Sequence, residues 1–180
     1  GGVGVYGDNA KIDFAVNAAG SKIIGVAAEN NTVVSNNIIV GEDSIGVYVL
    51  DNTVTFNGAS IVTGRKNSAT PVGILLKDTI GTYTQNNVSV DAKDGIGIYL
   101  GNDIGATTGV NLTFDGKIKT ENGVGIYIPK YTVLTTGDAA IDINGGTGIY
   151  IDEGTANLGT TKDLIFNFGK NSGIGIFNNG

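Results

Sequence analysis

The sequence predicts an all-β protein: a parallel β-helix (β-solenoid) of about eight rungs of about 21–28 residues each, with three short strands per rung and no helices. Two observations lead to this fold class. A six-residue phrase, clearest at 95–100 as Gly-Ile-Gly-Ile-Tyr-Leu, returns eight times in 180 residues, and a period of about 20–50 residues indicates stacked repeats. The stretches between the copies carry β-branched runs and turn residues instead of a helical pattern.

The eight copies of the phrase are centred on glycines that recur at similar but unequal intervals. These glycines are Gly4, Gly25, Gly46, Gly73, Gly97, Gly125, Gly148 and Gly175. Strands of one kind that recur once per repeat stack most simply in register, with one turn of a coil for each copy. The spacing therefore predicts a rod in which every copy lies directly on the previous one.

Within one copy, apolar residues alternate around the central glycine, which is the pattern of a half-buried strand. In the fifth copy we expect Ile96, Ile98 and Leu100 to face the core. Gly97 and Tyr99 are expected on the outer face. The alternation thus assigns an inner and an outer side to each copy.

Each copy is followed by a polar turn of Asn, Asp and Gly, residues that accept left-handed backbone. A second short strand such as 53–56 and a third such as 37–40 complete the rung. The first two intervals between central glycines are the shortest, so the longer rungs are expected to carry loops that project from the shaft. The clearest insertions are 64–70, 101–109 and 152–163.

The composition limits the function classes. The chain has 11 Lys and Arg against 17 Asp and Glu, a formal net charge of −6, which argues against nucleic-acid binding. It has no Cys or His, so it has neither thiolates nor imidazole ligands. We expect no catalytic residues, no cofactor and no metal. We interpret residues 1–180 as a single β-helix segment, an uncapped fragment of a longer array, whose open ends allow end-to-end self-association.

The residue two positions after each central glycine forms a predicted outer column. Its members are Tyr6, Ala27, Tyr48, Leu75, Tyr99, Tyr127, Tyr150 and Phe177. One interpretation is that each ring shields the bare glycine backbone beside it. The other is a flat aromatic surface that contacts sugar rings or another protein, for which Tyr99, Tyr127 and Tyr150 are the candidates.

Recognition residues usually lie on loops held by a rigid scaffold, and the loop 64–70 differs from its neighbours. It contains Arg65, the one arginine of the chain, next to Lys66. Both side chains can form charge-assisted hydrogen bonds to acidic groups. Arg65 and Lys66 are therefore the first candidates for ligand contacts, ahead of the tyrosine column.

Acidic residues recur in the turn after the phrase, at Asp8, Glu29, Asp51, Asp78, Asp103 and Asp152. Stacked carboxylates can hold a hard cation such as calcium, but solvated side-chain turns explain the same residues. The interruption of the column at Pro129 favours turns. A polysaccharide-active β-helix would need paired carboxylates beside a basic residue, and no such cluster is evident within the strands.

The recurring G-[IV]-G-[IV]-Y-[ILV] strand, its Asn/Asp turn and the T-V-T-F-like strand with an N-G turn resemble the passenger repeats of type V autotransporters. They are most similar to those of the very large fusobacterial outer-membrane adhesins, and the resemblance covers essentially the whole chain. It implies a right-handed β-helix that is extracellular, on the bacterial cell surface, as part of an outer-membrane protein.

The resemblance also implies a non-catalytic adhesive role, with a host-cell or bacterial surface protein or glycan as partner. No family binding residue carries over, because the repeat itself is scaffold. A β-helical polysaccharide-active enzyme fragment and a pure spacer stalk are the alternatives.

Overall fold

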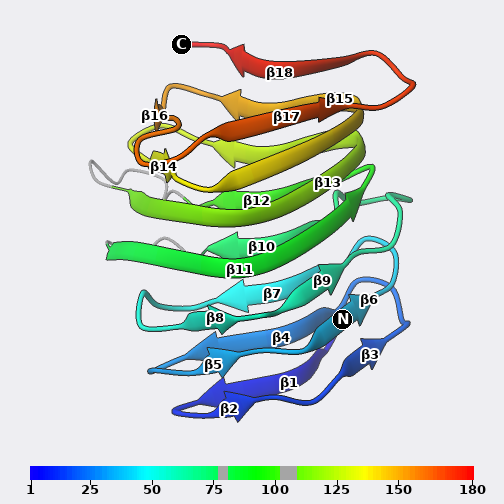
Figure 1. The fold of residues 1–180 in the computed structure, drawn as a ribbon. Helices are drawn as coiled ribbons and strands as arrows, with labels where there is room; N and C mark the ends of the chain where they lie inside the picture. Colours follow the sequence, from blue (N-terminus) through cyan, green and yellow to red (C-terminus); the bar gives the residue numbers. More distant parts are fainter. Residues whose placement is uncertain (77–80, 102–108) are drawn as a thin grey trace.

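The computed structural model describes the backbone of residues 1–76, 81–101 and 109–180, and the side chains of the same ranges except 81–87. It confirms an all-β parallel β-solenoid of about seven turns. Figure 1 shows the turns stacked along one axis, from the blue first turn to the red final strand β18. Within the described ranges there is no helix, and accordingly none that could cross a membrane.

Each turn has three faces, and the first face carries the repeated phrase. Its strands are β1 (Val3–Asp8), β4 (Ile24–Glu29), β7 (Ile45–Val49), β10 (Val72–Leu76), β12 (Ile96–Leu100), the last parts of β13 (Val110–Ile128) and β15 (Ala139–Ile151), and β18 (Gly173–Asn178). They pair in parallel, so that Tyr6 lies beside Ala27 and Tyr127 beside Tyr150. The predicted stacking of the copies is confirmed, and the eight copies enclose about seven turns.

Shorter strands between the copies build the other two faces. The second face consists of β2 (Lys11–Ile12), β5 (Val33–Val34), β8 (Thr55–Asn57), the first parts of β11 (Gly81–Lys93) and β13, β14 (Val133–Thr136) and β16 (Thr155–Asn157). The third face consists of β3 (Val16–Ala18), β6 (Asn37–Val40), β9 (Ser60–Val62), later parts of β11 and β13, the first part of β15, and β17 (Leu164–Phe168).

The expected three short strands per rung describe the first turns, whereas the later turns merge them. β13 runs for 19 residues over all three faces. Extended backbone continues around its corner at Gly116, where an added Cβ would lie 2.5 Å from the Val88 carbonyl oxygen. The missing side chain therefore lets two rungs approach closely at a bend without ending the strand.

Columns of β-branched residues fill the interior. The residue after each central glycine contributes one column. Its members Val26, Val47, Ile74, Ile98, Ile126 and Ile149 are all 0% exposed, whereas Val5 and Ile176 in the end strands are not fully buried. A buried column of the third face lies opposite, formed by Ile38, Ile61, Val90, Ile118 and Ile141. Burying each such side chain contributes about 1.5–3 kcal/mol, so the stacked columns are the main source of stability.

The structure corrects the predicted orientation of the central glycine. Ile98 and Leu100 are buried as expected, and Tyr99 is half-buried on the outer side. Gly97, however, is buried, and an added Cβ would lie 2.9 Å from Ile118 Cγ2 in the core and 2.5 Å from the Gly125 carbonyl oxygen. Ile96 is only half-buried. Gly97 and Ile98 are thus consecutive inward positions, because the strand does not keep a flat pleat through the glycine.

Candidate functional site

The predicted aromatic column is present on the outer side of the first face. The ring centroids of Tyr99 and Tyr127 are 5.1 Å apart at an interplanar angle of 13°, and those of Tyr127 and Tyr150 are 5.3 Å apart at 16°. Phe177 continues the column 5.1 Å from Tyr150 at a tilt of 31°. These spacings follow from strands paired in register, one strand separation apart.

The stacking bears on both interpretations of the column. The rings stack on each other's faces, and the side-chain positions of the central glycines point inward. A partner approaching from solvent meets ring edges and hydroxyls instead of a flat face. If Tyr99, Tyr127 and Tyr150 contact a ligand, hydrogen bonds to the hydroxyls are the contacts that this arrangement offers.

Two hydroxyls of the column donate hydrogen bonds to carboxylates. Tyr127 donates a hydrogen bond to Asp152 Oδ2 at 2.6 Å, and the Asn179 side chain donates to Oδ1 at 3.1 Å. Partial burial raises the pKa of Tyr127 well above its ordinary value, and the hydrogen bond to the carboxylate raises it further. The bond from Tyr127, with that from Asn179, lowers the pKa of Asp152. Tyr6 makes the same kind of bond to Glu29.

The loop 64–70 is exposed, as predicted for an insertion, and it is organised around a carboxylate from the rung below. Asp43 is 8% exposed and accepts backbone hydrogen bonds from Asn67, Ser68 and Ala69 at 2.7–3.0 Å, plus one from the Ser68 hydroxyl. Burial alone would raise the pKa of Asp43, but these four donors outweigh it and hold the pKa far below the usual range. The loop is therefore pre-ordered.

The candidate Arg65 contacts the protein itself. Its guanidinium donates to Asp94 Oδ2 at 2.9 Å and to Glu121 Oε1 at 2.8 Å, residues of the next two rungs. These two carboxylates hold the pKa of Arg65 above its usual value. Half of the side chain is nevertheless exposed, at 51%. Arg65 thus links its loop to the next two rungs through two ion pairs. The neighbouring Lys66 is exposed at the loop surface.

The other two predicted loops have different outcomes. Most of 101–109 lies outside the described residues, which end at 101 and resume at 109. The stretch 152–163 is not one projecting loop, because β16 lies within it and pairs in register with β14. Its ends form turns around a regular rung strand. The prediction was wrong there because the short strand carries no β-branched alternation long enough to be recognised.

The described acidic turn residues accept hydrogen bonds from their own turns and from neighbouring rungs. Asp51 accepts hydrogen bonds from the Thr53 backbone and hydroxyl at 2.8 and 2.6 Å, and from the Asn30 backbone at 2.7 Å. Asp8 accepts from the Asn30 side chain at 2.9 Å. In the described part of the chain no group of three or more carboxylates gathers at one point, and Asp78 and Asp103 lie outside it.

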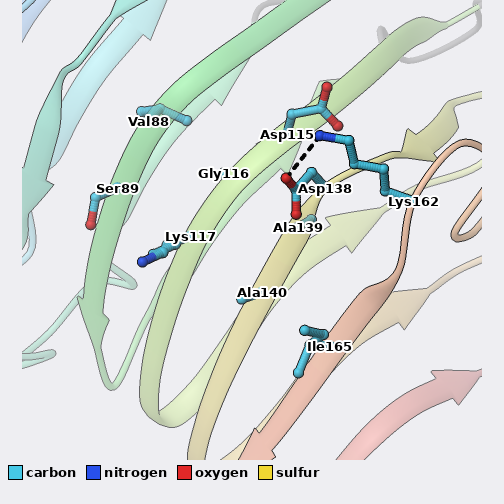
Figure 2. Close-up of a pocket in the computed structure, with 10 residues that line it drawn as sticks. All are labelled: Val88, Ser89, Asp115, Gly116, Lys117, Asp138, Ala139, Ala140, Lys162 and Ile165. Atoms are coloured by element: carbon cyan, nitrogen blue, oxygen red, sulfur yellow. Dashed lines mark hydrogen bonds and ion pairs between the residues drawn. The ribbon is translucent and has the colours of Figure 1, made fainter.

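A groove of about 770 Å³ lies along the corner between the second and third faces. Figure 2 shows Asp115, Asp138 and Lys162 together at one end of it. Lys162 Nζ lies 3.2 Å from Asp138 Oδ2, and both side chains are well exposed. One carboxylate oxygen of Asp115, Oδ1, is buried against Gly137 and has no hydrogen-bond partner.

The floor and the far end of the groove differ in character from this charged end. Ser89, Lys117 and Ala140 follow one another in one outer column of paired strands, so that Lys117 lies between two small residues. The same column ends at Ile165, which is 51% exposed. A volume of this size falls in the range of small-molecule sites. The groove thus offers acceptors, donors and an apolar surface to one ligand.

Sequence reasoning missed this groove. The charged residues at its one end, Asp115, Asp138 and Lys162, come from three successive turns, and no two of these three are close in the chain. A signal was present, because Asp115, Asp138 and Lys162 follow one another at an interval of about one rung. Aligning the rungs by their second corner, instead of by the phrase, would have placed the three side chains together.

Comparison with known proteins finds no matching family, no matching curated protein and no matching solved structure.

Proposed function

We propose that the chain is a non-catalytic structural and adhesive segment of a surface-displayed adhesin, of the kind that autotransporter passengers form. It is extracellular, on the bacterial surface, as part of an outer-membrane protein. It supports or mediates attachment to a protein or glycan on host cells or other bacteria. Nucleic acid is not a partner, since the chain carries a net charge of −6.

The observation that carries the proposal is the groove. On the first face the phrase places mostly aromatic residues at the same outer position, so that face presents similar chemistry at most turns. The groove instead combines a charged end, formed by Asp115, Asp138 and Lys162, with the exposed Ile165 at its far end. Polar groups beside an apolar contact area are the usual components of a recognition site. The rigid solenoid holds these residues in place, as a binding surface requires.

The test uses the 180-residue chain, fluorescently labelled, on host cells, bacterial cells and immobilised glycans. Binding by the wild-type chain should fall about tenfold in the double variant Asp138→Asn/Lys162→Gln, a change of about 1.4 kcal/mol. The matched control is Lys11→Gln/Asp13→Asn, which removes a similarly exposed ion pair of 3.1 Å elsewhere. This control should bind like the wild type.

Three outcomes would count against the proposal. Absence of binding to every surface would leave the spacer stalk as the better account. Binding that survives the groove variant but is lost when 64–70 is shortened would place recognition on the loop. Shortening of a polysaccharide during incubation would favour the enzyme alternative, which the proximity of Asp115, Asp138 and Lys162 makes worth measuring.

A further inference from the structure

Tyrosine is the principal oxidisable side chain of this protein. The sequence contains no Cys, Met, Trp or His, and it contains seven Tyr. Oxidants react first with sulfur where sulfur is present, and they act on electron-rich rings where it is not. In this chain the phenols are therefore the residues at which an oxidant withdraws electrons.

Three of these phenols are already arranged as neighbours. Tyr99, Tyr127 and Tyr150 stack with centroids 5.1 and 5.3 Å apart, and paired strands hold their backbones in register. All three are half-buried, so their ring edges remain open to a small oxidant. A radical formed on one ring thus has a second phenol in contact with it.

Tyr127, the central ring, also has a proton acceptor. Its hydroxyl donates to Asp152 Oδ2 at 2.6 Å, the length of a charge-assisted hydrogen bond. The carboxylate receives the proton when the phenol loses an electron, and its negative charge favours that loss. Asn179 holds the other oxygen of Asp152 in place.

The other tyrosines with described side chains lack this combination. Tyr6 bonds to Glu29, but its column neighbour is Ala27. Tyr48 lies between Ala27 and Leu75. Tyr131 is exposed on a turn with the Lys130 ammonium 5.2 Å from its ring centroid, and a cation there opposes electron loss.

We propose that Tyr99, Tyr127 and Tyr150 form an oxidative cross-linking site, in which Tyr127 couples to a neighbouring ring and joins two adjacent rungs covalently. Two phenols each lose one electron and one proton, the proton of Tyr127 passing to Asp152. A carbon–carbon bond forms between ring carbons ortho to the hydroxyls, and the ortho hydrogens return to the oxygens as the rings regain aromaticity. A peroxidase with hydrogen peroxide accepts the two electrons and two protons, and the peroxide is reduced to water.

The test treats the 180-residue chain at low concentration with a peroxidase and hydrogen peroxide. Mass spectrometry should find one major intrachain product, two hydrogens lighter, that joins Tyr127 to Tyr99 or Tyr150, with dityrosine fluorescence. Tyr127→Phe should abolish it, and Phe is tolerated in this column because Phe177 stacks on Tyr150. Asp152→Asn should slow it several-fold, and Tyr131→Phe should leave it unchanged.

Urea unfolding of each variant provides a check that folding is retained, so that a lost product reports chemistry and not unfolding. The proposal is overturned if Tyr127→Phe keeps the intrachain yield. It is equally overturned if the wild-type product joins separate chains through Tyr6 or Tyr131 in preference to the column.

Discussion

Replacing Gly97 by alanine tests the orientation of the central glycine. The added methyl would lie 2.5 Å from the Gly125 carbonyl oxygen and 2.9 Å from Ile118 Cγ2. The carbonyl belongs to the next rung, whose separation of about 4.8 Å is set by the ladder hydrogen bonds. It cannot move away without weakening that ladder. Overpacking a core lowers the free energy of unfolding by about 1–3 kcal/mol. Because the Gly125 carbonyl cannot move, we expect a loss near the upper end, about 3 kcal/mol.

The measurement is the urea midpoint, with the slope checked for constancy. Gly20→Ala is the matched control, since its nearest neighbour, Ile23 Cγ2, lies at 3.8 Å, and it should be neutral or stabilising by about 0.4–1 kcal/mol. Combining Gly97→Ala with Ile118→Ala should cost less than the sum of the two, because the contact of the added methyl with Ile118 Cγ2 disappears while that with the Gly125 carbonyl oxygen remains. A stability within about 0.5 kcal/mol of wild type for Gly97→Ala would refute the inward orientation.

Three further predictions follow from the core, the loop and the ends. Ile126→Ala should lower the free energy of unfolding by about 2–5 kcal/mol, since Ile126 is 0% exposed, and Tyr127→Ala should lower it distinctly less. The reverse order in urea unfolding would mean that the inner and outer faces are assigned the wrong way round. The amides of 67–69 should exchange slowly with deuterium and faster in Asp43→Asn. Because the pKa of Asp43 is lowered, the stabilisation of the loop by its carboxylate is fully present above about pH 4 and is lost only in stronger acid. Loss of amide protection near pH 5 would therefore contradict the hydrogen-bond assignment. The 180-residue chain should associate with rising concentration, because its end strands β1 and β18 each pair on one side and expose Tyr6 and Ile176; light scattering that shows a strict monomer would oppose this.

The stacking of rungs could be predicted from the sequence because it depends on a recurring interval. The column from Tyr6 to Phe177 was obtained by aligning the copies of the phrase, and each of its pairs is confirmed by the strand register. Neither the insertion between the third and fourth copies nor the longer rungs disturb it. An inserted loop changes the length of a rung but leaves the ladder pairing of its strands intact.

The orientation of Gly97 could not be predicted, because period-2 alternation assumes a continuous pleat. The strand pairs Val72 with Ile96 and Ile74 with Ile98, but Gly97 and Ile98 are both buried, so the alternation is interrupted at the glycine. The partners of Arg65 were hidden for a different reason. Asp94 and Glu121 lie 29 and 56 residues further along the chain, and only the turns of the coil bring them to its guanidinium.

The claim that recognition takes place in the groove is tested most directly by blocking it. The chain has no cysteine, so Ser89→Cys provides a single attachment point for a bulky maleimide on the floor of the groove. Thr55→Cys, exposed on the second face, is the matched control. We predict that labelling Ser89→Cys abolishes binding to the target surface and that labelling Thr55→Cys leaves binding intact. Equal binding by the two labelled proteins would contradict the account.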